Sequence, residues 1–176
     1  MSFQRIDCGS ATLAGDDNLV FRAELVEPFV VAAFNVLEQV AHIKCERGPL
    51  SMRQGATFTT QELTVVVGVI GEIEGVSLYG MSVVTALKIA AAMMGQEVVQ
   101  LDEMALSAIK ELGNMISGQA TTLLAETQFE CEITPPTLLH GAGIQAATPA
   151  PTLLIPVNTD VGRIDIDISL TRRRNR

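Results

Sequence analysis

Apolar residues recur with helical spacing in three segments of the chain. Residues 24–41 are apolar on almost every side of the helix they predict, so this helix is expected to be mostly buried. Pro28 falls in its first turns, where a missing N–H does the least harm. Residues 83–94 predict a second helix that stops at Gly95, and residues 102–126 predict a third.

Strand patterns lie between and after these helices. Some are runs rich in β-branched residues, and others alternate apolar and polar positions with a period of two. They predict strands at residues 51–60, 63–70, 76–81, 128–134, 152–157 and 163–170. A glycine-bounded turn at 71–75 joins the strands at 63–70 and 76–81 into a hairpin, and the strands at 152–157 and 163–170 form a second hairpin. A loop rich in Gly, Ala and Pro is expected over residues 138–151.

The final predicted strand alternates strictly between apolar and polar residues. Its apolar positions share one face, and its polar positions, Asp165, Asp167 and Ser169, share the other. Antiparallel sheets commonly have one face packed on the core and one face in water. The pattern therefore predicts that these three polar side chains are solvated.

The two halves of the chain repeat one order of elements. Each begins with a long helix and continues with a strand and a hairpin, and the helix at 83–94 links them. Residues 34–37 correspond weakly to residues 113–116, which pairs Asn35 with Asn114. We expect an α+β fold of two pseudo-repeated helix–strand–hairpin halves, with an antiparallel sheet and helices packed on one face. The two long helices should then be neighbours, related by an approximate two-fold axis.

The composition fits a single folded domain. The chain has 176 residues, of which 48% are hydrophobic and 18% charged, so it can bury a core and is too apolar for disorder. Residues 1–20 are expected to form a loosely ordered lead-in, residues 21–171 the domain, and residues 172–176 a frayed basic tail.

Charge and cysteine content exclude several classes of function. A net charge of −8 offers no basic face for a phosphate backbone, so no nucleic-acid partner is expected. The most apolar stretch, residues 76–94, contains Lys88 and predicts a strand followed by a helix, so no membrane span is expected. Cys8, Cys45 and Cys131 are odd in number and widely spaced, which indicates a cytoplasmic protein rather than a disulfide framework.

Histidine, the usual general base at neutral pH, occurs only twice in the sequence. The sequence also lacks a Gly-rich phosphate loop, a G-x-S-x-G turn and an H-E-x-x-H pair. One alternative is a metal-binding regulatory domain with His42, Cys45, Cys131 and His140 as ligands, although the second pair lacks metal-finger spacing. The sequence contains no self-sufficient catalytic centre of a common kind.

The most informative polar positions lie on the predicted helix at 102–126. At about 100° per residue, Glu111 and Asn114 lie about 60° apart on neighbouring turns, opposite the apolar stripe. Ser107 extends this surface, and Gly118 leaves room beside it. Gly113 costs about 1 kcal/mol relative to Ala inside a helix, so a local contact is expected to require a small residue. From the pattern alone, the simplest interpretation is a solvated helix face with a glycine for close packing.

These residues also match a known signature. In the CheC/CheX/FliY phosphatases of bacterial chemotaxis, a surface helix carries Glu-x-x-Asn, with Asp or Ser four residues earlier and Pro some twenty residues later. The corresponding residues here are Ser107, Glu111, Asn114, and Pro135 or Pro136. The order of elements extends the resemblance over roughly residues 20–170. The chain is thus identified as a CheX-like member of this family.

The resemblance implies a phosphatase that hydrolyses the aspartyl phosphate of a CheY-like response regulator. Asn114 would orient the attacking water, and Glu111 would pair with a Lys of the regulator. Ser107 and Gly118 would complete the surface that binds this partner. No cofactor is expected in this chain, because the Mg²⁺ of the reaction would belong to the regulator.

The resemblance further implies a homodimer joined through sheet edges and a single active site in each subunit. On the first long helix Asn35 aligns with Asn114, but Ala32 stands where the Glu would be, so Asn35 is expected to be structural or vestigial. The main alternative function is a non-catalytic CheX-like dimerisation or adaptor domain that binds a signalling protein.

Overall fold

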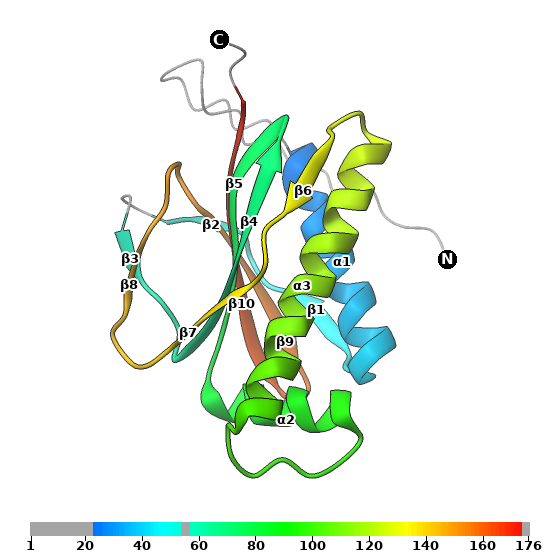
Figure 1. Ribbon diagram of the computed structural model, residues 1–176, viewed down its shortest axis with the longest axis vertical. Helices are drawn as coiled ribbons and strands as arrows, with labels where there is room; N and C mark the ends of the chain where they lie inside the picture. The colour runs from blue at the N-terminus through cyan, green and yellow to red at the C-terminus, as the bar shows by residue number, and fades with distance from the viewer. Residues whose placement is uncertain (1–22, 54–56, 174–176) are drawn as a thin grey trace.

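The computed structural model in Figure 1 describes residues 23–53 and 57–173. The lead-in expected at residues 1–20 lies outside these described residues, as does most of the expected basic tail.

The described part of the chain contains three helices, each close to its predicted position. They are α1 (Ala23–Ala41), α2 (Val83–Met94) and α3 (Glu103–Glu126). The boundaries follow from local chemistry. Gly95 ends α2 with φ 64°, a left-handed conformation that glycine adopts without strain. Asp102 caps the N-terminus of α3, because its side chain accepts a hydrogen bond of 2.8 Å from the backbone N–H of Ala105 in the first turn.

Ten strands lie in the described residues. They are β1 (Cys45–Arg47), β2 (Ser51–Met52), β3 (Thr57–Thr59), β4 (Leu63–Gly71), β5 (Ile73–Met81), β6 (Cys131–Ile133), β7 (Thr137–His140), β8 (Gln145–Ala147), β9 (Leu153–Thr159) and β10 (Gly162–Arg172). The predicted single strand at 51–60 is wrong, because β2 and β3 are separate. The predicted loop at 138–151 contains strand β8 and most of β7. These pieces are too short to show a period of two in the sequence.

The strand order supports an internal duplication. The large sheet runs β1-β9-β10-β5-β4-β6, with β2 also paired to β9 and β7 also paired to β4, while β3 pairs with β8. Each strand from β1 to β5 has a counterpart five strands later, so that β1 corresponds to β6, β2 to β7, and β5 to β10. When every strand is exchanged with its counterpart, the strand order of the sheet is the same but runs in the reverse direction. All these pairings are antiparallel. The predicted α+β fold with two repeated halves is therefore confirmed, and α1 corresponds to α3.

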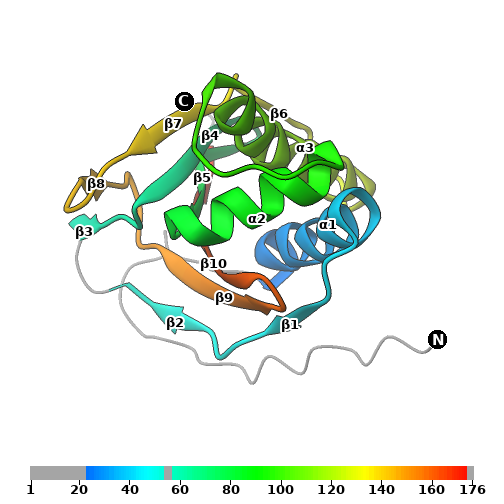
Figure 2. The same cartoon turned by 90° about the horizontal axis from the view of Figure 1, so that it is seen from below.

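Helices α1 and α3 pack side by side on one face of the sheet, as predicted, and α2 crosses one end (Figures 1 and 2). The core lies between these helices and the sheet. Its largest fully buried side chains include Phe29, Leu37, Ile109, Leu112, Ile116, Tyr79, Leu63 and Ile155. This arrangement leaves the outer face of α3 free of the core.

The opposite face of β10 is not solvated, so the prediction for its polar residues is wrong. Asp165 and Asp167 are each 3% exposed, and Ser169 is fully buried. Asp167 accepts two hydrogen bonds from Arg53, 2.7 Å from Nε and 3.0 Å from Nη2. Figure 2 shows β3 and β8 on this side, away from α1 and α3. Alternation identifies residues that share a face, but it carries no information about distant segments that cover that face.

Removal of Arg53 should show how much the buried carboxylate of Asp167 destabilises the fold when its partner is missing. Burial raises the pKa of Asp167 above 3.8, although Arg53 lowers it. Arg53→Ala is expected to lower the free energy of unfolding by about 2–3 kcal/mol near neutral pH, because it removes hydrogen bonds to a buried carboxylate. Without Arg53 the folded-state pKa of Asp167 rises further, so protonation should relieve the loss as the pH falls towards about 4.

Arg163→Ala is the matched control for this effect. Arg163 contacts Asp165 at 2.6 Å, but its side chain is 54% exposed, against 21% for Arg53. Its removal should cost about 1 kcal/mol or less. Urea unfolding of both variants at several pH values measures the difference. Equal losses, or a loss for Arg53→Ala that grows as the pH falls, would contradict this account.

Candidate functional site on helix α3

The outer face of α3 carries the predicted polar residues. Ser107 and Glu111 are exposed, and Asn114 is half-buried. The Asn114 side-chain Nδ2 donates a long hydrogen bond of 3.5 Å to Oε2 of Glu111. The buried residues of the helix lie on its other side, and include Ala105, Ile109, Leu112, Gly113, Ile116, Ser117, Ala120 and Leu124. The structure therefore brings Glu111 and Asn114 together on one accessible surface, as their spacing predicted.

Gly113 lets this helix lie close to the sheet. A Cβ atom added there would stand 2.7 Å from Cγ1 of Val65 and 3.3 Å from Cδ2 of Tyr79. The predicted need for a small residue is thus explained by contacts with β4 and β5. The neighbouring residue, Asn114, is held on the outer side of the same turn.

Gly118 has a different environment. A Cβ atom there would meet only Cδ1 of Ile133, at an ordinary contact distance of 3.8 Å. Its carbonyl oxygen accepts hydrogen bonds from the hydroxyls of Thr121 and Thr122, at 2.9 and 3.0 Å. Packing within the described residues therefore does not require glycine at this position. Gly118 is half-buried, and it places no side chain of its own on the helix surface there.

The two glycines make a matched pair of stability predictions. Ala at either position gains the same helix propensity of about 1 kcal/mol, which cancels in the comparison. Gly113→Ala should nevertheless be less stable than Gly118→Ala by about 1–3 kcal/mol, because only the first overpacks the interface with the sheet. Urea denaturation measures both free energies of unfolding. Equal stability of the two variants would show that α3 does not sit as closely on the sheet as described.

The proline pair of the signature lies beside α3. Strand β6 contacts this helix, and Thr134, which follows it, is fixed to β4. Its backbone N–H donates to the Gly68 carbonyl at 2.9 Å, and its Oγ1 accepts from the Gly68 N–H at 2.9 Å. Pro135 is exposed and Pro136 half-buried immediately after this anchor. The two prolines therefore lie in the short interruption between β6 and β7, which both pair with β4.

The alternative prediction, a metal site formed by His42, Cys45, Cys131 and His140, is wrong. Cys45 lies on β1 and Cys131 on β6, which are the two ends of the large sheet. With about 4.8 Å between adjacent strands, five intervals separate them by about 24 Å, too far for a shared ion. Burial raises the pKa of Cys45 to about 11, so its thiol keeps its proton at neutral pH. Among all described residues, no group of three or more His, Cys, Asp or Glu is arranged to hold a metal.

Helix α1 presents no counterpart to Glu111. Ala32 is fully buried and Asn35 is half-buried. The first half of the duplication therefore lacks both the carboxylate and the exposed position that it would need. Separately, no helix among the described residues is long and apolar enough to cross a membrane.

Comparisons with known proteins agree on one family. A family model described as chemotaxis phosphatase CheX matches residues 63–158. CheY-P phosphatase CheX of Thermotoga maritima is 34% identical over 150 residues, which are 85% of this chain and 96% of the relative. The crystal structure of chemotaxis protein CheX from Desulfovibrio desulfuricans has 26% identity and a TM-score of 0.76, and the match covers 85% of this chain and 99% of that one.

A further solved structure was determined with a partner. It is the CheX-CheY-BeF3-Mg²⁺ complex from Borrelia burgdorferi, in which the matching chain has 27% identity and a TM-score of 0.73. The match covers 86% of this chain and 100% of that one. The residues matched by the family model include the whole of α3, and with it the four site residues.

Proposed function

We propose that this chain, which belongs to the CheX family of chemotaxis phosphatases, hydrolyses the aspartyl phosphate of a CheY-like response regulator. The observation that carries the proposal is the juxtaposition of Glu111 and Asn114 on the accessible face of α3. The relative from Thermotoga maritima is a CheY-P phosphatase, and the relative from Borrelia burgdorferi was solved in a complex with CheY.

Asn114 is proposed to orient the attacking water. Phosphoryl transfer depends mainly on positioning and on charge stabilisation, so a strong base is not required when the leaving group is as good as the carboxylate of an acyl phosphate. A carboxamide can both accept from and donate to a water molecule. Within the described part of the chain, the Asn114 amide makes a single long hydrogen bond of 3.5 Å. Its oxygen and its second N–H are thus available to a water molecule.

Glu111 is proposed to pair with a Lys of the regulator and so to set the register of the complex. Residues at i and i+3 project from neighbouring turns of one helix, so α3 would deliver both side chains together. Ser107 and Gly118 are proposed to extend the contact on either side. The bare surface at Gly118 allows close approach by a partner.

The Mg²⁺ ion is assigned to the regulator. The related complex was solved with CheY, beryllium fluoride and Mg²⁺ together, which is consistent with that assignment. This chain is then proposed to contribute only side-chain positioning. The proposed substrate and the widely spaced cysteines favour the cytoplasm. A homodimer formed through the short edge strands β1, β2, β6 or β7 remains a prediction.

The direct experiment follows phosphate loss from a radiolabelled response regulator with and without this protein. The proposal predicts that catalytic amounts of the protein accelerate the loss beyond the regulator's own rate. Unchanged phosphate loss together with tight binding of the phosphorylated regulator would instead support the non-catalytic adaptor function.

A further inference from the structure

We propose that Tyr79 and Ser117 are positioning residues for the phosphatase reaction, because they hold the turn of α3 that carries Asn114. This inference rests on the proposed function. It assigns a role to a buried group of hydroxyls that touches neither the regulator nor the phosphate. We call Tyr79, Ser117 and Ser77 the hydroxyl chain.

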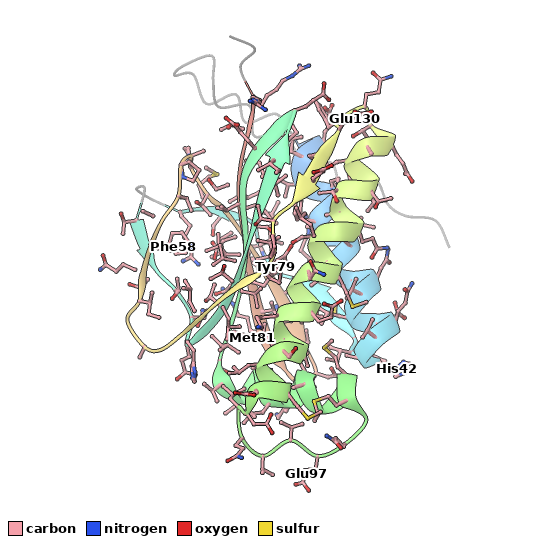
Figure 3. The ribbon with its side chains drawn as sticks, in the orientation of Figure 1. His42, Phe58, Tyr79, Met81, Glu97 and Glu130 are labelled. Carbon is pink, nitrogen blue, oxygen red and sulfur yellow. The ribbon has the colours of Figure 1, made fainter. Side chains whose placement is uncertain are left out.

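The hydroxyl chain lies directly under the proposed catalytic turn. Tyr79 Oη and Ser117 Oγ are 2.7 Å apart. The Tyr79 ring also approaches Gly113, where an added Cβ would stand 3.3 Å from Cδ2. Gly113 precedes Asn114 by one residue and Ser117 follows it by three. One aromatic side chain therefore contacts the inner side of the turn at both of its ends, and Figure 3 shows Tyr79 in the middle of the sheet, next to α3.

The chain of hydrogen bonds continues into the sheet. Ser117 Oγ lies 3.1 Å from Ser77 Oγ, and Ser77 Oγ donates to the Val67 carbonyl at 3.4 Å. One assignment of protons satisfies every member. Tyr79 donates to Ser117, Ser117 to Ser77, and Ser77 to Val67. Burial raises the pKa of Tyr79 to about 12, so its hydroxyl keeps the proton that it donates.

The hydrogen bonds of the hydroxyl chain are needed to fix the rotation of α3, because the other core contacts between this helix and the sheet are mainly apolar. Ile109, Leu112 and Ile116 make non-directional contacts, which tolerate small rotations of the helix. Side-chain tips lie about 5–6 Å from a helix axis, so a rotation of about 10° displaces them by about 1 Å. A displacement of that size can reduce a reaction rate by about 10²-fold. The hydroxyl chain fixes the rotation of α3 and therefore the position of the Asn114 amide.

Tyr79→Phe is the sharpest test, because it removes one hydroxyl and keeps the ring against Gly113. At saturating phosphorylated regulator, the rate of phosphate loss should fall about 10-fold. Affinity for a regulator activated with beryllium fluoride should change less than about 3-fold, because Glu111 and the outer surface remain. This separation of rate from affinity distinguishes positioning from a general loss of structure.

Thr152→Val is the matched control. Thr152 is fully buried and its hydroxyl lies 2.8 Å from that of Thr148, on the sheet face away from α3. Its removal should cost a similar amount of stability and leave the saturated rate unchanged. Ser117→Ala carries the same expectation as Tyr79→Phe, and replaces it if that variant does not fold.

The outcomes separate this inference from the proposed function. An active wild-type protein whose Tyr79→Phe and Ser117→Ala variants keep the full saturated rate would overturn the positioning role alone. An equal loss of rate in Thr152→Val would also overturn it, since instability would then explain the effect. A wild-type protein without any phosphatase activity would refute the proposed function and the positioning role together.

Discussion

Replacing Asn114 with alanine is expected to slow dephosphorylation of the regulator by about 10²–10³-fold, the usual cost of losing one well-placed transition-state contact. The protein should remain folded, because Asn114 is only half-buried, its side chain makes one long hydrogen bond, and Ala is the better helix former. Binding of the phosphorylated regulator should survive, because Glu111 and Ser107 stay on the same face. The expected variant binds its substrate and does not turn it over.

Asn35→Ala is the matched control for this prediction. It makes the same substitution on α1, the helix that corresponds to α3 in the duplication, and Asn35 is also half-buried. Its activity should equal that of the wild type. Asn114→Asp should be as inactive as Asn114→Ala, because the added charge would face a phosphate although the side chain keeps its shape. Equal losses in Asn35→Ala and Asn114→Ala would show that the effect is not specific to the proposed site.

Reversing the charge of Glu111 is expected to abolish formation of the complex. Glu111→Ala should weaken binding by about 2–5 kcal/mol, the range for a charge pair that is desolvated in an interface. Glu111→Lys should remove detectable binding, because it places a like charge beside the proposed Lys of the regulator. Titration of the activated regulator into each variant, followed by calorimetry or fluorescence, measures the change.

Glu126→Lys controls for the change in net charge. Glu126 is exposed on the same helix, 15 residues beyond Glu111, which is about 22 Å along the axis. A Lys near the C-terminal end of a helix also favours its dipole, so this variant should fold well. Its affinity should resemble that of the wild type. Unchanged affinity in Glu111→Lys would remove Glu111 from the interface.

Features encoded by neighbouring residues were predictable from the sequence. The helices followed from apolar spacing together with local caps such as Asp102 and Gly95, and both long hairpins followed from strand patterns around short turns. The shared face of Glu111 and Asn114 followed from their spacing of three residues. Their proximity to each other required no knowledge of the rest of the fold.

Features that depend on distant segments were not predictable. The carboxylates on the polar face of β10 are bound by Arg53 and Gln61, which lie more than a hundred residues earlier in the chain. Among the residues that the structure describes, strand β1 pairs only with the distant β9, and its three residues show no pattern of their own. In the sequence, Ser117 is one more position of the predicted helix at 102–126. The available signal was a hydroxyl on its apolar side, matched by Ser77 and Tyr79, which share one face of β5.

The most direct test of the central claim compares two time courses of phosphate loss from a radiolabelled regulator, measured at protein concentrations that saturate binding. The account predicts rapid loss with the wild-type protein, and loss near the regulator's own rate with Asn114→Ala, although both proteins are bound to the regulator. Wild-type-like dephosphorylation by Asn114→Ala would contradict it, because catalysis would then not depend on the amide that α3 presents.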